Sequence, residues 1–346
     1  MSTYRAAIVG LSSIGARRPE PIRNGALVLP MPGSHVAAYA VLPQVEVVAF
    51  CDLKADLLAR FRADWSDVWP EARGYENYGE MLAREDIDLL SVVTGDNRHA
   101  DIVVDACQAG VRAIFCEKPL ATTLADADRM IAACGARGVV MSVDHTRRWM
   151  AIWQRAREAI RAGEIGRPAR IIATLGGPRA MLFRNGTHLL DAVNFLVESD
   201  PVWVVAALDP GFEDYCEYRG DGGHDPASEP GGAAIVEYAS GARAFINASK
   251  GTPSEFSVTV IGESGKIAVS DVGAELYRAA VGATRPLHPG GWRLQGIAAG
   301  VEELIRALES GSEVSSPPEA ARQALAIIVA MLESQRRGSC PESFRD

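Results

Sequence analysis

Short apolar runs alternate with helical segments through the first 144 residues. Residues 4–9, 45–51, 87–93, 111–115 and 139–143 have strand character, and residues 35–42, 100–109 and 124–134 have helical patterns. Strands separated by helices favour a parallel sheet, because parallel neighbours need a long crossover connection. The sequence therefore predicts an α/β domain over residues 1–144, with a doubly wound parallel sheet of the Rossmann type.

The first predicted strand runs directly into a glycine-bearing turn. Gly10 and Gly15 fit the first and third glycines of G-x-G-x-x-G, and Ser12 stands in the second place. Such a turn brings backbone N–H groups to a pyrophosphate at the start of a helix. Serine still allows close approach and adds a hydroxyl donor, although its Cβ restricts φ. An ordinary glycine turn is the alternative. The predicted cofactor contacts here are Gly10, Ser12, Ser13, Ile14 and Gly15.

An acid, Asp52, follows the second predicted strand. An acid in this place can accept hydrogen bonds from two ribose hydroxyls. NAD is therefore the preferred cofactor, and NADP stays possible. The interval from Gly15 to Asp52 exceeds the roughly 20 residues typical of this motif. The excess lies in residues 16–33, which are rich in proline and glycine and are interpreted as an insertion of open role. Ser34 is the expected N-cap of the helix that follows.

The strand over residues 111–115 leads into Glu117, Lys118 and Pro119. A strand with this ending delivers an amine to the carboxyl edge of a parallel sheet, where ligands bind in open α/β folds. A solvated charge pair before a turn proline is the alternative.

Residues 145–346 have a different pattern. A helix over residues 149–162 precedes alternating strands at residues 169–175, 202–208, 233–239, 242–248, 255–261 and 266–269. This pattern predicts an α+β domain with a large, mostly antiparallel sheet whose open face suits a partner subunit. The acidic, glycine-rich residues 209–232 are expected to form a solvated loop, with a lid as the alternative.

A second chemical segment lies within this half of the chain. Leu189, Val193 and Leu196 recur at helical spacing, and Thr187 or Asn185 is the expected cap. His188 and Asp191 are three residues apart and therefore adjacent on this helix. The positive end of the helix favours a neutral imidazole base, and the carboxylate opposes it. A histidine that satisfies local backbone groups is the alternative.

Composition limits the classes of partner. The 346 residues carry a net charge of −9 without a basic stripe, which argues against nucleic acid or an anionic membrane as partner. No apolar run reaches about 18 residues and no signal peptide is evident, so a cytoplasmic protein is expected. The six cysteines are scattered without C-x-x-C, and neither a metal site nor a disulfide framework is predicted.

These motifs, in this order, resemble the Gfo/Idh/MocA family. The resemblance rests on the glycine turn with Asp52, Thr94 with His99, Glu117-Lys118-Pro119, and the pattern Gly186-x-His188-x-x-Asp191. It implies an amino-terminal Rossmann domain, a carboxy-terminal α/β domain, and homodimers or homotetramers formed through the carboxy-terminal sheet. It also implies hydride transfer between NAD or NADP and a secondary alcohol or ketone of a sugar, cyclitol or sugar derivative.

The resemblance also assigns roles to residues. Lys118 would hydrogen-bond the reacting oxygen, His188 would move its proton, and Asp191 would orient or tune His188. The loops beside the nicotinamide ribose would contribute Thr94, Asp96, His99, Glu117 and Lys118. The expected substrate-binding residues are Lys118, Arg148, Arg184, Asn185 and His188.

Two departures from the family pattern leave the mechanism and the substrate open. Gly95 and Asp96 replace a common proline and asparagine, and Arg184 stands where many members carry an aspartate. Arginines expected near the cleft, namely Arg147, Arg148, Arg179 and Arg184, favour a carboxylate or phosphate substrate, with solvated surface arginines as the alternative. Two other functions stay open: glycoside cleavage by transient oxidation with NAD, and non-catalytic sensing of a dinucleotide.

Overall fold

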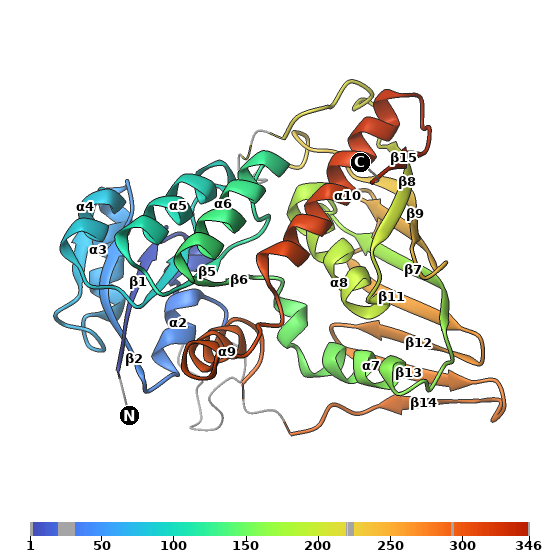
Figure 1. The fold of residues 1–346 in the computed structure, drawn as a ribbon, viewed down its shortest axis with the longest axis horizontal. Coiled ribbons are helices and arrows are strands. Elements are labelled where there is room, and N and C mark those ends of the chain that lie inside the picture. Colours follow the sequence, from blue (N-terminus) through green and yellow to red (C-terminus); the bar gives the residue numbers. More distant parts are fainter. Residues whose placement is uncertain (1–2, 20–31, 219, 221–224, 292–293, 345–346) are drawn as a thin grey trace. The chain divides into compact units, whose positions relative to one another are not determined.

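The chain divides into two compact units (Figure 1). The computed structural model describes residues 3–19, 32–218, 220, 225–291 and 294–344. The first unit comprises Met1–Trp149 and Trp292–Glu319, and the second comprises Met150–Gly291 and Ala320–Asp346. Most of the predicted insertion, residues 20–31, lies outside the described residues.

The first unit is built on a six-stranded parallel sheet of order β3-β2-β1-β4-β5-β6. Its strands are β1 (Tyr4–Val9), β2 (Val45–Cys51), β3 (Arg73–Tyr75), β4 (Leu89–Val92), β5 (Ala113–Cys116) and β6 (Val140–Val143). The strand order reverses between β1 and β4, which creates the crevice that binds ligands in doubly wound folds. The predicted parallel sheet is confirmed, and β3 is an additional strand.

Helices pack on both faces of this sheet. They are α1 (Ser13–Ala16), α2 (His35–Ala40), α3 (Ala55–Trp65), α4 (Tyr78–Arg84), α5 (His99–Ala109), α6 (Leu124–Arg137) and α9 (Gly296–Ser310). Figure 1 shows α5 and α6 on one side of the sheet and α2 and α9 on the other. As predicted, Ser34 caps α2, because its hydroxyl accepts a hydrogen bond from the backbone N of Ala37 at 3.2 Å. The helix ends at Ala40, two residues earlier than predicted.

Helix α9 comes late in the chain but belongs to the first unit. Its apolar residues Ile297 and Val301 share one core with Phe115 and Trp149. The indole Nε1 of Trp149 also donates a hydrogen bond to Glu303 Oε2 at 2.8 Å. The amphipathic pattern of a helix indicates which face is buried but not which unit buries it. Two consecutive blocks were expected from the sequence, and α9 departs from that arrangement.

The second unit contains a nine-stranded sheet of order β14-β13-β12-β11-β7-β10-β9-β8-β15. All its neighbouring strands are antiparallel except β7 and β10. The mostly antiparallel sheet that the sequence predicts is therefore confirmed. The strands are β7 (Pro168–Gly176), β8 (Pro201–Leu208), β9 (Gly232–Tyr238), β10 (Arg243–Ser249), β11 (Glu255–Gly262), β12 (Gly265–Ser270), β13 (Gly273–Arg278), β14 (Ala283–Leu287) and β15 (Glu342–Ser343).

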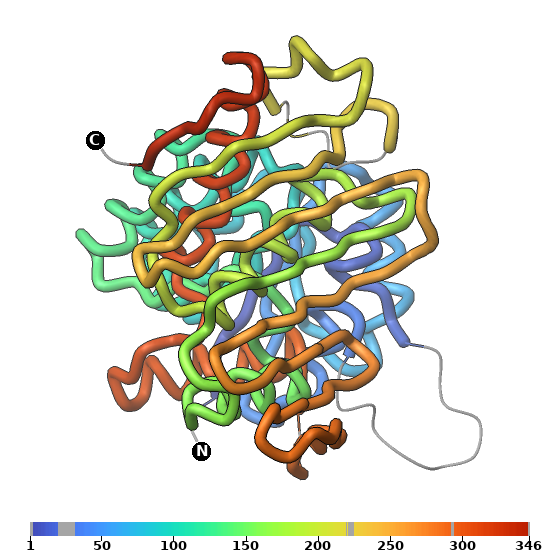
Figure 2. Tube along the Cα trace, turned by 90° about the vertical axis from the view of Figure 1, so that its right-hand side faces the viewer, coloured from blue at the N-terminus to red at the C-terminus, as the bar shows by residue number. Residues whose placement is uncertain are grey.

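One face of this sheet carries helices and the other is open. Helices α7 (Ala151–Arg161), α8 (Thr187–Val197) and α10 (Pro318–Arg336) lie on one face (Figure 1). Ser334 ties α10 to β8, because its hydroxyl accepts a hydrogen bond from the backbone N of Ala206 at 3.0 Å. Figure 2 shows the opposite face, over which no described element passes. The predicted open-faced sheet is confirmed.

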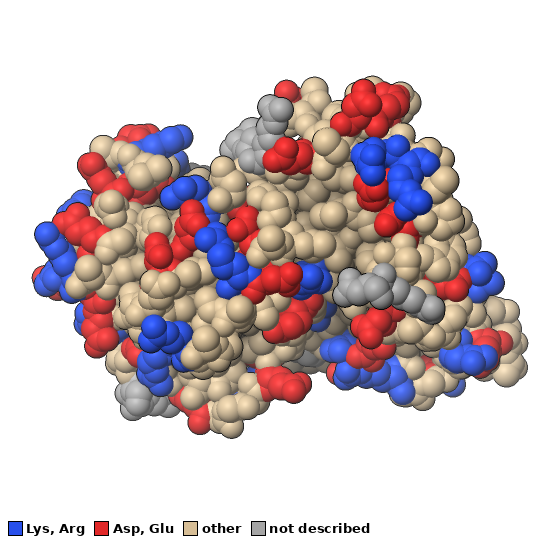
Figure 3. All heavy atoms as spheres, turned by 45° about the horizontal axis from the view of Figure 1, so that its top comes forward, with Lys and Arg blue, Asp and Glu red and all other residues tan. Residues whose placement is uncertain are grey.

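Charged side chains are mixed in small groups on the face drawn in Figure 3. Ion pairs on the surface include Arg18 with Asp67 at 2.6 Å and Arg84 with Glu80 at 2.8 Å. Within the described ranges, no helix combines the length and apolar character needed to cross a membrane.

Candidate functional site

The turn after β1 requires glycine at two positions. Gly10 has φ of 98°, and a Cβ on it would lie 2.2 Å from the carbonyl oxygen of Val93. A Cβ on Gly15 would lie 2.2 Å from the carbonyl oxygen of Gly10. Ser12 has φ of −63°, so serine takes the second position of the motif without strain. The side chains of Ser12, Ser13 and Ile14 are exposed, and the turn is therefore open to a ligand.

Asp52 lies directly against this turn. Its Oδ2 accepts a hydrogen bond from the backbone N of Leu11 at 2.8 Å, and its Oδ1 accepts one from the backbone N of Lys54 at 3.0 Å. The side chain is half-exposed, and each carboxylate oxygen has a further lone pair for a ribose hydroxyl. The structure thus brings together the two parts of the predicted dinucleotide motif, and the residues present fit such a cofactor.

The segment after β4 carries Thr94 and Asp96, and His99 is the first residue of α5. Thr94 is half-exposed, whereas Asp96 and His99 are buried. The two ring nitrogens of His99 lie 3.0 Å from the carbonyl oxygen of Pro119 and 3.3 Å from that of Thr94. His99 therefore ties the loop after β4 to the loop after β5. Contact of these residues with a cofactor stays a prediction.

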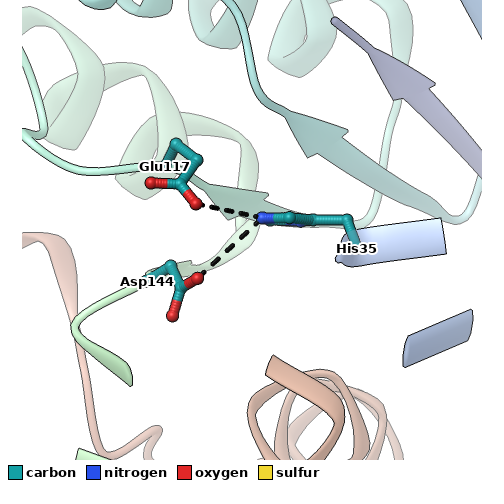
Figure 4. Close-up of side chains that lie close together, drawn as sticks. All are labelled: His35, Glu117 and Asp144. Atoms are coloured by element: carbon teal, nitrogen blue, oxygen red, sulfur yellow. Dashed lines mark hydrogen bonds and ion pairs between the residues drawn. The ribbon is translucent and has the colours of Figure 1, made fainter. Parts of the chain in front are cut away.

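Glu117 and Lys118 follow β5 at the carboxyl edge of the sheet, as predicted. The backbone N of Lys118 donates to Glu117 Oε2 at 3.1 Å, and Lys118 is half-buried. His35 Nε2 lies 3.4 Å from Glu117 Oε1 and 3.9 Å from Asp144 Oδ2 (Figure 4). We call His35, Glu117 and Asp144 the buried cluster. Sequence reasoning missed His35 and Asp144, although Asp144 follows β6 just as Asp52 follows β2 and Glu117 follows β5.

The two acids of the buried cluster differ in charge. Burial opposes ionisation of Glu117, but the hydrogen bond with His35 and the charges of Lys118 and His35 lower its pKa to about 2. Burial and the negative charge of Glu117 raise the pKa of Asp144 to about 7. At neutral pH, Glu117 is therefore ionised while Asp144 exchanges a proton.

The predicted site residues of the second unit lie just before α8 or in its first turns. A π-helical turn, Leu182–Gly186, precedes the helix and contains Arg184 and Asn185. The predicted cap is wrong, because Gly186 occupies the N-cap position and no side chain caps the helix. Single π-helical turns are frequent at functional sites. His188 is half-buried and Asp191 is buried in the first turns of α8.

Tyr218 fixes this region and was missed by sequence reasoning. Its hydroxyl accepts a hydrogen bond from Arg184 Nη2 at 3.0 Å, and its ring stacks on Phe183 with a centroid distance of 4.2 Å. The expectation of a solvated loop over residues 209–232 is wrong at Tyr218 and Glu229, which are both buried. A glycine-rich loop has no hydrophobic periodicity, so the sequence does not indicate that one of its aromatic side chains is buried.

The four candidate arginines have different surroundings. Arg148 is buried, and its Nη1 donates to the carbonyl oxygen of Ser315 at 2.6 Å. Arg179 is exposed, Arg147 is half-buried and Arg184 is only 7% exposed. Arg184 is therefore the arginine that lies both near His188 in sequence and within a fixed polar environment.

Curated relatives of the chain include dehydrogenases of a sugar and a cyclitol. D-apiose dehydrogenase of Paraburkholderia graminis is 35% identical over 177 residues, 47% of this chain and 46% of that protein. Inositol 2-dehydrogenase of Salmonella paratyphi B is 28% identical over 208 residues, 57% of this chain and 56% of that protein. The matched segments thus span about half the length of these relatives.

The fold matches a solved structure over its whole length. Aldose-aldose oxidoreductase of Caulobacter crescentus, crystallised with glycerol, has a TM-score of 0.80 at 19% identity, covering 99% of this chain and 100% of that one. Residues 4–145 match the family model described as an oxidoreductase family with an NAD-binding Rossmann fold. Residues 153–268 match the model of the GFO/IDH/MocA C-terminal domain. With both domain models matched in order, the chain belongs to the Gfo/Idh/MocA family of oxidoreductases.

Proposed function

We propose that the protein is an NAD-dependent dehydrogenase or reductase acting on a secondary alcohol or ketone of a sugar, cyclitol or sugar derivative. The observation that carries this proposal is the shared sheet edge, where Lys118 follows β5 and the Asp52-bound glycine turn follows β1. The names of the curated relatives, D-apiose dehydrogenase and inositol 2-dehydrogenase, support the class of substrate.

The proposed chemistry divides between three side chains. An alcohol is too weak an acid to lose its proton at neutral pH without a cation that stabilises the forming alkoxide and a base within about 3 Å. Lys118 donates a hydrogen bond to the reacting oxygen, and His188 takes up or returns the hydroxyl proton. Asp191 orients or tunes His188. A bound nicotinamide would supply the hydride acceptor for a carbinol carbon or the hydride donor for a ketone carbon.

NAD is the proposed cofactor, in preference to NADP. A 2′-phosphate would place negative charge against Asp52, whose carboxylate can instead accept hydrogen bonds from a free ribose diol. The other proposed cofactor contacts are Gly10, Ser12, Ser13, Ile14, Gly15, Thr94, Asp96, His99, Glu117 and Lys118.

The arginine side chains favour a negatively charged substrate. Arg184 is buried beside Tyr218, and its guanidinium can bind a carboxylate or phosphate through two parallel hydrogen bonds. The proposed substrate-binding set is Arg184 with Lys118, Arg148, Asn185 and His188.

We also propose a homodimer or homotetramer formed through the open face of the sheet. Phe245 of β10 pairs in register with Ile172 of β7 and Ile235 of β9, and Val205 of β8 pairs with Ile235. Phe245 is 41% exposed and Ile172 is 49% exposed. An apolar row of this kind on an open face suits a partner subunit.

A cytoplasmic location is proposed as well. All six cysteines are free, including Cys107 and Cys134, whose sulfur atoms lie 3.6 Å apart. Free thiols are usual where glutathione keeps proteins reduced. We propose no nucleic-acid or membrane partner.

The experiment is a screen of the purified protein with NAD against polyols, aldoses, uronates and glycosides, followed by NADH fluorescence. We expect substrate-dependent NADH to accumulate in proportion to turnover with at least one polyol, aldose or uronate. Cleavage of a glycoside without net NADH would contradict the proposal, and so would NAD binding without turnover of any class.

A further inference from the structure

The buried cluster contains Glu117, the residue before Lys118, and its other two members, His35 and Asp144, have no part in the proposed reaction. The imidazole of His35 is fully buried, and Glu117 and Asp144 are 8% and 2% exposed. Ionisable groups removed from water need partners within the protein. The cluster therefore has a defined set of hydrogen bonds and charges.

A continuous chain of hydrogen bonds runs through the cluster to Lys118. Tyr39 Oη lies 2.6 Å from Ser91 Oγ, and Ser91 Oγ lies 2.9 Å from His35 Nδ1. His35 Nε2 lies 3.4 Å from Glu117 Oε1, and a hydrogen on this nitrogen is donated to the carboxylate. The other oxygen of Glu117 accepts from the backbone N of Lys118 at 3.1 Å. The chain thus holds the backbone from which the lysine side chain extends.

Asp144 is the second acid of the buried cluster. Its Oδ1 accepts a hydrogen bond from Thr146 Oγ1 at 2.9 Å, and its Oδ2 faces His35. The charged groups that act on it are Glu117 after β5, His35 on α2 and Lys118. Two adjacent buried carboxyls do not readily ionise together, so one of them holds a proton. Glu117 is charged throughout the physiological range, and Asp144 adds its charge as the pH rises through about 7.

We propose that His35 and Asp144 are positioning residues for Lys118. Acting through Glu117, the cluster anchors the backbone of the lysine and sets the charge of its amine. This inference rests on the proposed role of Lys118 in the reaction. The positive charge of Lys118 lowers the pKa of both acids of the cluster.

The same three side chains are of types that bind divalent cations, and their ligand atoms lie within 4.8 Å of one another. Two observations favour a proton, and not a metal ion, between the acids of the cluster. Glu117 and Asp144 each already bond a protein donor, Lys118 N and Thr146 Oγ1. The amine of Lys118 supplies positive charge to both acids, so a second cation close by would be repelled.

The test measures the pKa of Lys118 directly, without a substrate. The chain has only four lysines, Lys54, Lys118, Lys250 and Lys266, so ¹³C-methylation of the amines gives a simple NMR spectrum for a pH titration. A Lys118→Arg variant assigns the resonance. We expect Asp144→Asn to lower the pKa of Lys118 by about one unit, because it removes a nearby negative charge. Ser91→Ala should lower the pKa of Lys118 less, because it removes only the hydrogen bond that orients His35 toward Glu117.

Ser142→Ala is the matched control. Ser91, Phe115 and Ser142 lie in one register row across β4, β5 and β6, and both serines are buried. The hydroxyl of Ser142 has no hydrogen-bond partner among the described residues. Its removal should leave the pKa of Lys118 unchanged, and the other three lysines should titrate alike in every variant.

An unchanged Lys118 pKa in both Asp144→Asn and Ser91→Ala would overturn the inference. A stoichiometric divalent metal in the purified protein that His35→Gln loses would overturn it too. If Asp144→Asn does not fold by circular dichroism, Ser91→Ala and His35→Gln decide the question by the same titration. Shifted pKa values together with full turnover by Lys118→Ala would support the positioning and contradict the proposed function instead.

Discussion

The backbone N of Leu11 donates a hydrogen bond to Asp52 Oδ2 at 2.8 Å, which joins the glycine turn after β1 to the acid after β2. This bond fixes the position of the carboxylate relative to the turn that would hold a pyrophosphate. An anchored carboxylate discriminates more sharply between NADH and NADPH than a mobile one does, because it cannot move away from the 2′-phosphate of NADPH.

Substitution of Asp52 should change the choice of cofactor. We expect wild-type protein to bind NADH more tightly than NADPH, and Asp52→Ser to narrow that difference by about tenfold, the value of one hydrogen bond to a charged group. Titration of cofactor fluorescence measures both dissociation constants. Asp56→Ser, an exposed acid in the first turn of α3, is the control and should change neither. Equal or tighter binding of NADPH by the wild type would show that Asp52 does not select NAD.

Lys118 and His188 should act as one catalytic unit. Lys118→Ala and His188→Ala should each lower kcat by about 10²–10⁴-fold with NAD binding nearly intact, because each removes help to the same proton-transfer step. The double variant should lose far less than the product of the single effects. Asp191→Asn should have a smaller effect. Steady-state kinetics with the substrate found by the screen measures these changes, and Lys266→Ala on β12 is the control. Fully additive losses would contradict a shared step.

Arg184 should determine the preferred charge of the substrate. Arg184→Gln should lower kcat/KM for uronates or sugar phosphates by about tenfold to a hundredfold, because a bidentate charged contact is lost. Tyr218→Phe, which removes only the hydroxyl that holds the guanidinium, should cause a smaller loss of the same kind. Arg179→Gln, at an exposed arginine, is the control. Turnover of neutral cyclitols without any turnover of anionic sugars would contradict this prediction.

The open sheet face should carry the subunit interface. Phe245→Glu places a charge in the apolar row and should shift the protein toward the monomer, as measured by size-exclusion chromatography with light scattering. Val272→Glu is the matched control, since Val272 is 97% exposed in the turn between β12 and β13. A wild-type protein that is monomeric at micromolar concentration would refute the interface.

Asp144 should make stability fall as the pH rises from about 4 to about 7. Its folded pKa of about 7 lies above the value of an unfolded aspartate, so over this window the folded state holds a proton that the unfolded state has lost. Asp144→Asn should therefore be more stable relative to wild type at pH 8 than at pH 5, by at least about 1 kcal/mol. Urea unfolding at the two pH values measures the difference. The reverse order would mean that Asp144 is ionised in the folded protein across this range.

The sequence by itself determined the class of fold and the order of the motifs. Apolar runs ending at Gly10, Asp52 and Glu117 predicted a parallel sheet with polar residues at its carboxyl edge, since local patterning fixes where strands begin and end. The proposed roles came from the resemblance of these motifs, and of the segment around His188, to a known family. These features are local in sequence, so a single chain displays them.

Only the tertiary structure decided which distant side chains meet. His35 lies on α2, and Glu117 and Asp144 directly follow β5 and β6; the local pattern marks both acids as strand ends but does not indicate that they meet His35. Tyr218 lies far from Arg184 in the chain, and α9 joins the first unit although it follows most of the second. Periodicity reports which side of an element is buried, but its partner is chosen by the packing of the whole chain.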